Sequence, residues 1–166
     1  YLEDWRKMAD RVDEFQEEVR IAMVGKYTGL SDSYLSVIKA LQHSSIAVNR
    51  RLVIDWIEST DLDSSIKHTN GDAHRKAWET LKLADGILVP GGFGNRGVEG
   101  KIEAARYARE SRVPYLGICL GLQIATIEFC RNELGLQGAN SEEFVDNPDS
   151  LETVSYTHLT LPTKPF

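Results

Sequence analysis

The segment from residue 114 to residue 123 constrains the fold more than any other part of this chain. It reads Pro114-Tyr115-Leu116-Gly117-Ile118-Cys119-Leu120-Gly121-Leu122-Gln123, an apolar run that meets a cysteine between two glycines and continues into a helical apolar pattern. The spacing G-x-C-x-G predicts a strand, a sharp turn and a helix, because small neighbours let the backbone turn tightly. A cysteine at that turn is exposed at the carboxyl edge of a sheet. The segment therefore predicts that Cys119 is a nucleophile rather than a core thiol.

Apolar runs and helical patterns alternate along the chain at intervals of about 30 residues, as in successive β–α–β units. The expected strands are residues 19–24, 52–57, 86–89 and 113–118, and the expected helices are residues 31–48, 73–83, 98–110 and 120–132. This alternation predicts an α/β fold, with a mostly parallel sheet covered by helices on both faces. Ligands of such sheets bind beyond the carboxyl ends of the strands, so the loops after the third and fourth strands are the expected site.

Three further segments carry structural expectations. Residues 1–18 place apolar side chains three or four apart and predict an amphipathic linker helix that packs on another surface. The polar segment 58–72 predicts a loop. In the helix after Cys119, the residues expected to be buried are Leu122, Ile124, Ala125 and Phe129.

The third expected strand ends in a glycine-rich loop, Pro90-Gly91-Gly92-Phe93-Gly94-Asn95-Arg96-Gly97. Four glycines in eight residues permit positive φ angles and exposed N–H groups, which can hold an anion or a developing oxyanion without side chains. The alternative is a flexible turn. The neighbouring strand, turn and helix around Cys119 (residues 114–123) have the pattern of a nucleophile elbow, and this elbow favours an oxyanion loop. By contrast, the Gly25-Lys26 pair lacks the spacing of a phosphate-binding loop.

Composition excludes several classes of function. The chain has 166 residues, a size that fits one domain, and its net charge of −6 without a basic patch argues against nucleic acid as a main partner. No apolar run approaches the roughly 18 residues of a membrane span.

The two cysteines are too far apart to form a disulfide. Cys119 and Cys130 lie about three helical turns apart, near 16 Å at about 1.5 Å per residue. Reduced thiols and the lack of a signal peptide predict a cytoplasmic protein, and the absence of an initiating Met predicts a piece of a longer one.

These motifs resemble the class I, triad-type glutamine amidotransferases, and within that class the CTP synthase family. The resemblance runs from about Val19 to Phe144. It is carried by the glycine loop, the elbow and three further stretches, which are Gly25-Lys26-Tyr27-Thr28-Gly29-Leu30-Ser31-Asp32-Ser33-Tyr34, Asn95-Arg96-Gly97-Val98-Glu99-Gly100 and Ala139-Asn140-Ser141-Glu142-Glu143-Phe144.

The resemblance implies that Cys119 attacks the side-chain amide of glutamine and forms a thioester, and that the N–H groups of Gly92 and Leu120 stabilise the oxyanion. The substrate-binding residues that it implies are Gly91, Gly92, Phe93, Leu120, Gln123 and Glu143. It also implies that GTP activates the protein through a loop containing Arg96, Gly97 and Glu99. No metal site is implied in this domain.

The implied parent protein makes CTP from UTP, with ATP and Mg bound in a synthase domain that residues 1–18 would join to this one. The implied assembly is a homotetramer, with neither a nucleic acid nor a membrane partner. Residues 19–148 would then form a partial amidotransferase domain, and residues 149–166 an atypical tail that is foreign, frameshifted or artificially added.

The family supplies the base of its triad from a downstream His-x-Glu segment, and these 166 residues contain none. His158 is the sole histidine after Cys119, and its sequence context does not match. The sequence therefore predicts a fragment that is inactive alone. The alternative is a non-catalytic chain that binds an effector or full-length subunits.

Overall fold

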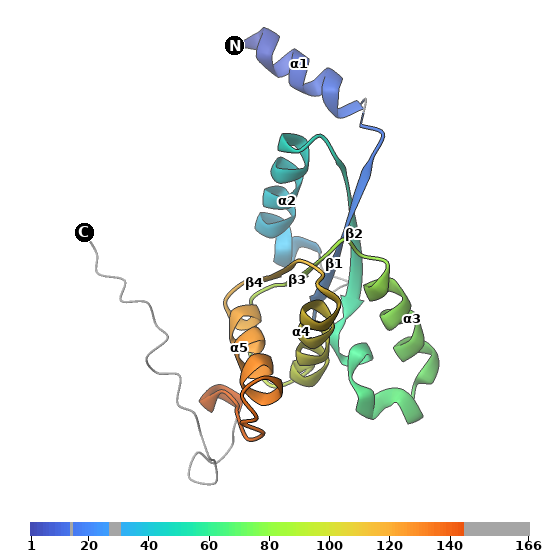
Figure 1. Ribbon diagram of the computed structural model, residues 1–166. Helices are drawn as coiled ribbons and strands as arrows, with labels where there is room; N and C mark the ends of the chain where they lie inside the picture. The colour runs from blue at the N-terminus through green and yellow to red at the C-terminus, as the bar shows by residue number, and fades with distance from the viewer. Residues whose placement is uncertain (14, 27–30, 145–166) are drawn as a thin grey trace, which may run out of the picture.

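The fold is built on a four-stranded parallel sheet, as the alternating pattern predicts. A computed structural model describes residues 1–13, 15–26 and 31–144 (Figure 1). The strands are β1 (Glu18–Gly25), β2 (Arg51–Glu58), β3 (Gly86–Val89) and β4 (Tyr115–Gly117). Their order is β2-β1-β3-β4. The order reverses between β1 and β3, and a reversal of this kind opens a ligand crevice at the carboxyl ends of the strands.

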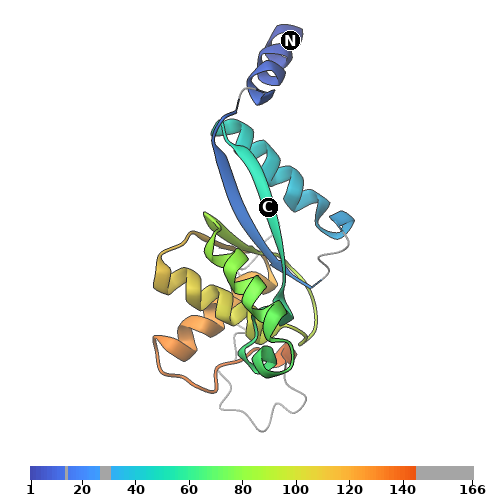
Figure 2. The same cartoon turned by 90° about the vertical axis from the view of Figure 1, so that its right-hand side faces the viewer.

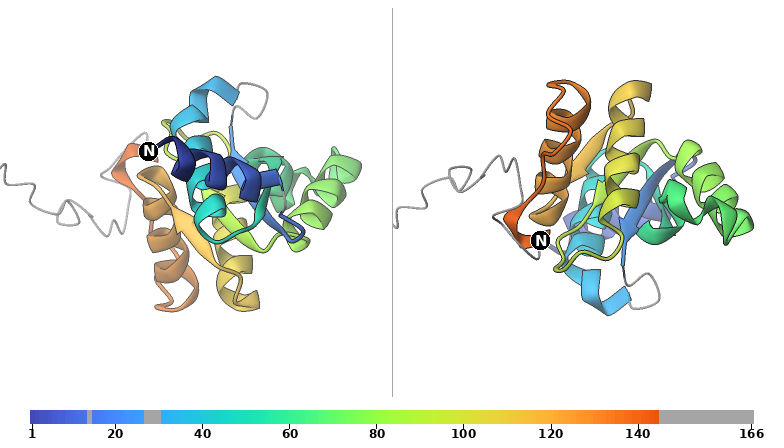
Figure 3. Two further views of the ribbon diagram at one scale, coloured as in Figure 1. Left: turned by 90° about the horizontal axis from the view of Figure 1, so that it is seen from above. Right: turned by 90° about the horizontal axis from the view of Figure 1, so that it is seen from below.

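Helices alternate with these strands at nearly the expected positions. They are α1 (Leu2–Asp13), α2 (Leu35–Ala47), α3 (Gly71–Lys82), α4 (Val98–Ser111) and α5 (Leu120–Asn132). Helices α2 and α4 lie on opposite sides of the sheet (Figure 3), so the prediction of helices on both faces is confirmed. Helix α1 extends away from the sheet beyond the amino end of β1 (Figures 1 and 2), and its apolar residues Leu2 and Trp5 are exposed.

Two hydrophobic clusters hold the helices in place. The first joins the sheet to α3 and α4 and includes Val24, Leu81, Ile87 and Ala104. The second joins α4 to α5 and includes Ile102, Ile124 and Ile127. Tyr115 of β4 packs against both clusters. Helix α4 is thereby buried on both sides, and α5 is held through α4 at the edge of the sheet formed by β4.

Two expectations are wrong in detail. The segment expected to be a loop between β2 and α3 contains two 3₁₀ helices, η2 (Ser59–Leu62) and η3 (Ser64–His68), with Leu62 fully buried in the first cluster. In α5, Ile124 is buried as expected and Ala125 is half-buried, but Leu122 is 62% exposed and Phe129 is 48% exposed. They are exposed because α5 packs through the stripe Leu120, Ile124 and Ile127, which recurs every three to four residues on one side of the helix.

Candidate functional site

Cys119 lies at the turn between β4 and α5, where the sequence places it. The Ile118 N–H donates to the Val89 carbonyl at 3.0 Å and extends the pairing of β4 with β3 up to the turn. Cys119 then adopts φ +52° and ψ −105°, and it is exposed. A non-glycine residue with positive φ is strained by roughly 1–3 kcal/mol, and such strain clusters at functional sites. Cys130, in contrast, is buried in α5.

Both glycines of the G-x-C-x-G motif are required by close packing. A Cβ on Gly117 would lie 2.4 Å from the backbone carbonyl of Gly121, and a Cβ on Gly121 would lie 2.1 Å from the Val89 oxygen. Both distances are too short for atoms that are not bonded to each other. The two glycines therefore let the first turn of α5 rest directly on the ends of β3 and β4.

The glycine loop after β3 lies against this elbow. A Cβ on Gly91 would lie 3.4 Å from the Cβ of Cys119, and one on Gly92 would lie 3.6 Å from Cδ2 of Leu120. Leu120 is the first residue of α5, so its N–H has no acceptor within the helix. The structure thus brings together Cys119, Gly91, Gly92 and Leu120, which the sequence predicts to form one site.

A lysine that directly follows β1 holds the next part of the loop. The Lys26 ammonium donates to the carbonyl of Phe93 at 2.7 Å and to that of Gly94 at 3.4 Å. Gly94 has φ +77°, a conformation that favours glycine. Sequence reasoning missed this role. The available signal was that Lys26 directly follows β1, the strand beside β3 in the sheet.

Tyr115 supports the elbow from within the fold, and sequence reasoning missed this residue too. Its hydroxyl donates to the Gly121 carbonyl at 2.8 Å. Burial, and secondarily the charge of Glu128, raise the pKa of Tyr115 far above its ordinary value, so the hydroxyl stays a donor. Glu128 is itself buried and accepts from Arg109 of α4 at 2.8 Å. The Tyr115 hydroxyl therefore ties β4 to the first turn of α5, and the pair of Arg109 and Glu128 ties α5 to α4.

The residues expected to bind substrate differ in their surroundings. Phe93 is 84% exposed. Gln123, in the first turn of α5, has a buried Oε1 with no hydrogen-bond partner among the described residues. Glu143 is exposed in η4 (Glu142–Phe144), and the Asn95 side chain donates to the Phe144 carbonyl at 3.4 Å. That contact joins the glycine loop to the segment containing Glu143.

The residues expected in the effector loop make ion pairs at the start of α4. Arg96 lies 3.4 Å from Glu58, and Glu99 lies 3.1 Å from Arg131. Burial raises the pKa of Glu58, and the charge of Arg96 opposes that shift.

Gly97 has φ +73°, and a Cβ there would lie 2.1 Å from the Ser59 hydroxyl. This glycine closes the loop against η2. Within the described ranges, the Ser59 hydroxyl is buried and makes no hydrogen bond.

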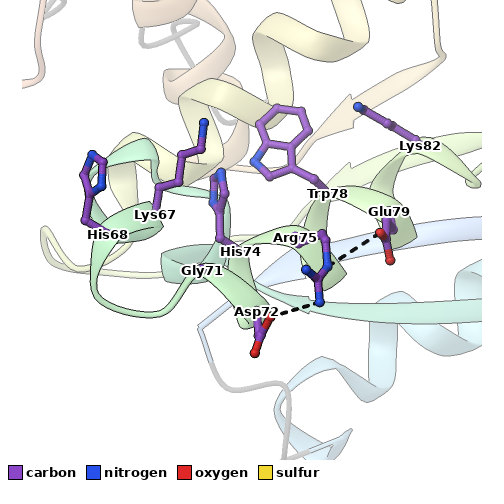
Figure 4. Close-up of a pocket in the computed structure, with 9 residues that line it drawn as sticks. All are labelled: Lys67, His68, Gly71, Asp72, His74, Arg75, Trp78, Glu79 and Lys82. Atoms are coloured by element: carbon purple, nitrogen blue, oxygen red, sulfur yellow. Dashed lines mark hydrogen bonds and ion pairs between the residues drawn. The ribbon is translucent and has the colours of Figure 1, made fainter.

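The histidines before Cys119 are not at the elbow. A cavity of about 780 Å³ beside α3 is lined by His68 and His74, together with Lys67, Gly71, Asp72, Arg75, Trp78, Glu79 and Lys82 (Figure 4). Helix α3 packs on β2, at the opposite edge of the sheet from β4. His43 lies on α2, and His158 lies outside the described residues. No cluster of metal-ligating side chains occurs in the described part of the chain, and none of its helices is long and apolar enough to cross a membrane.

Comparisons with known proteins agree with this arrangement. The family Glutamine amidotransferase class-I matches residues 29–158. The chain therefore belongs to the class I glutamine amidotransferases.

Its relatives within the class are CTP synthases. It is 55% identical over 148 residues to the CTP synthase of Dictyostelium discoideum, which covers 87% of this chain and 26% of that protein. It is 53% identical to CTP synthase 1 of Saccharomyces cerevisiae, over 89% of this chain and 26% of that protein. The chain thus spans about a quarter of the length of these relatives.

A solved structure shares the fold. It is the glutaminase domain of Trypanosoma brucei CTPS with bound acivicin, with a TM-score of 0.68 and 44% sequence identity. The match covers 81% of this chain and 48% of that one.

Proposed function

We propose that this chain is the nucleophile-bearing part of a CTP synthase glutaminase domain, which hydrolyses glutamine and supplies ammonia for the conversion of UTP to CTP. The observation that carries the proposal is the elbow. Cys119 is exposed, held at positive φ at the start of α5, and packed against the Gly91-Gly92 loop. The identity of 44% to a glutaminase domain supports the same reaction.

In the proposed reaction the Cys119 sulfur attacks the side-chain amide carbon of glutamine. The carbonyl oxygen becomes an oxyanion, which the N–H groups of Gly92 and Leu120 stabilise, a contribution of about 3 kcal/mol per donor in comparable sites. The C–N bond then breaks, the amine takes a proton and leaves as ammonia, and a glutamyl thioester remains. Water attacks the thioester, releases glutamate and regenerates the thiol.

Four residues would select glutamine in this scheme. Gln123 and Glu143 would bind the amino-acid end of the substrate, because a carboxylate suits the α-ammonium group. The orphaned Oε1 of Gln123 fits a position that acquires its donor only with substrate bound. Phe93 would lie along the aliphatic stem, and Gly91 would leave room beside the sulfur.

The wider activity follows from the relatives and is part of the proposal. The complete protein would use ATP and Mg in a synthase domain and would assemble as a cytoplasmic homotetramer. GTP would activate it through the loop with Arg96, Gly97 and Glu99. The ion pairs of Arg96 with Glu58 and of Glu99 with Arg131 would give this loop a defined resting position.

The proposed reaction needs a group that accepts the thiol proton and delivers a proton to the leaving amine. No His-x-Glu follows Cys119 within the 166 residues, and the histidines before it lie on other elements. We therefore propose that these residues alone turn over glutamine negligibly, because members of a catalytic triad act as a unit.

A labelling experiment tests the nucleophile. Purified chain is treated with acivicin, and modified peptides are mapped by mass spectrometry in the wild type and in the matched variants Cys119→Ala and Cys130→Ala. We expect slow modification that is confined to Cys119 and lost only in Cys119→Ala. Equal modification of Cys130 would contradict a formed elbow.

The same samples test the proposed inactivity, through release of glutamate from glutamine. We expect no release above the level of Cys119→Ala. Turnover that disappears on replacing Cys119 would show that a base is present after all.

The exposed apolar side of α1 favours a second candidate, a non-catalytic chain that binds full-length subunits or an effector. Leu2 and Trp5 are both largely exposed on that helix. Mixing this chain with an intact CTP synthase distinguishes the two candidates. A changed assembly or a changed response to GTP supports binding, and an unchanged enzyme contradicts it.

A further inference from the structure

The ammonium of Lys26 is bound to the backbone of the glycine loop rather than to a carboxylate. It donates to two successive carbonyls, those of Phe93 and Gly94. Over residues 1–13, 15–26 and 31–144, no other side chain donates to a carbonyl of residues 91–94, and Lys26 has no ion pair. The position where a Gly94 Cβ would stand is 3.5 Å from the Lys26 nitrogen, so the ammonium lies close against this glycine.

Two hydrogen bonds of this kind fix the orientation of the loop. A peptide unit is planar, so a carbonyl that points toward Lys26 directs the N–H of the following residue to the opposite side. The two bonds therefore set the peptide units between residues 93 and 94 and between 94 and 95. Glycine-rich backbone has little conformational preference of its own, so its orientation depends on such contacts.

Lys26 has no carboxylate partner among the described residues. A second ammonium, that of Lys101 of α4, lies near it, and Glu58 of β2 lies near Lys101. Lys101 repels Lys26, and Glu58 is paired with Arg96. The loop carbonyls are therefore the partners that keep the Lys26 ammonium at this position.

We propose that Lys26 is a positioning residue, which holds the glycine loop so that the Gly92 N–H faces the oxygen of a substrate attached to Cys119. The inference rests on the proposed glutaminase function and adds a residue to its site. Lys26 does not touch the substrate. It acts through the backbone of residues 93 and 94, which lie one and two residues beyond the oxyanion donor.

The test compares two probes of Cys119. Glutamate γ-semialdehyde is the aldehyde analogue of glutamine, and the Cys119 thiol adds to it reversibly. The S–C bond forms, and the thiol proton passes to the aldehyde oxygen. That oxygen then occupies the oxyanion site. Iodoacetamide alkylates the thiolate by displacing iodide and needs no oxyanion donor. The apparent Kd of the aldehyde is measured by its protection of Cys119 from iodoacetamide, with mass-spectrometric mapping of the modified residue.

The variants are Lys26→Met, which keeps the length of the side chain but removes its donors, and Lys26→Arg, which keeps donors and charge. Lys39→Met on α2 is the matched control, because Lys39 is exposed and distant in sequence from the loop. We expect Lys26→Met to raise the apparent Kd of the aldehyde about tenfold or more. This is a part of the loss seen when an oxyanion donor is removed outright. The iodoacetamide rate stays within about twofold. Lys26→Arg recovers most of the affinity, and Lys39→Met behaves as wild type.

Three results would overturn the proposal. They are an unchanged aldehyde affinity in Lys26→Met, an equal loss for both probes, and a failure of Lys26→Arg to recover affinity. Failure of the function itself gives a different result, because the wild type would then show no protection by the aldehyde at all.

Discussion

Replacing Lys101 with methionine should make the free energy of unfolding change less between neutral and alkaline pH. Lys101 is 2% exposed in α4, and its ammonium makes no ion pair or hydrogen bond with the described part of the chain. Burial first, and the charge of Lys26 second, lower the pKa of Lys101 from its ordinary value of 10.5 to about 8, although Glu58 opposes the shift. The folded chain therefore carries a poorly solvated ammonium at neutral pH.

The sign and size of the effect follow from proton linkage. Below pH 8 the lysine is protonated in both states, so the folded state carries the full cost. Between the two pKa values the folded chain has lost the proton and the unfolded chain has kept it, so stability rises with pH. From pH 7 to pH 9.5 the gain is about 2 kcal/mol, and solvent screening lowers it to about 1–2 kcal/mol.

The assay is urea unfolding at pH 7 and pH 9.5, followed by the fluorescence of Trp56 and Trp78. Other groups also titrate in this range, so the measured quantity is the difference in unfolding free energy between Lys101→Met and wild type. We expect Lys101→Met to be the more stable at pH 7 and its advantage to shrink by about 1–2 kcal/mol at pH 9.5. Lys39→Met serves as the exposed control. An advantage that is the same at both pH values would refute a desolvated charge at Lys101.

Three further predictions concern the elbow and its support, each measured by urea unfolding. Cys119→Gly should be more stable than Cys119→Ala by about 1 kcal/mol, because glycine relieves the positive φ, and a ranking with alanine above glycine would contradict strain there. Gly121→Ala should lose about 3 kcal/mol, since its Cβ would stand 2.1 Å from the Val89 oxygen; a loss under about 1 kcal/mol would mean that α5 can shift. Arg109→Met should lose about 3 kcal/mol by leaving Glu128 buried without its cation, and adding Glu128→Gln should recover part of that loss.

The strands and the elbow could be predicted because their signals are local. The four apolar runs are short and separated by helical patterns, and G-x-C-x-G states its own geometry. The burial pattern of α5 could not be predicted in the same way, because apolar residues occur on more than one side of this helix. The side of α5 that is buried is set by its contact with α4. Ile102 of α4 packs with Ile124 and Ile127, and Leu122 stays exposed.

The core of the site was predictable, and its supports were not. Cys119 and Gly92 are recognisable from motifs, but the bond from Lys26 to Phe93 joins residues 67 apart in sequence. The hydrogen bond from Tyr115 to Gly121 joins residues that are only 6 apart in sequence, yet it depends on the direction in which α5 leaves the strand. Contacts of this kind become visible only when the topology is known.

The direct contact between the glycine loop and the elbow has a consequence for transplanting this chemistry. Gly121 rests on the last carbonyl of β3, and Gly91 lies against Cys119, so the cysteine motif is shaped to the end of a neighbouring strand as much as to its own. A pentapeptide grafted onto another parallel sheet would bring the thiol without the surface it was fitted to. The smallest portable unit is therefore a pair of adjacent strands with both of their following turns, and changes in one turn should require matching changes in the other.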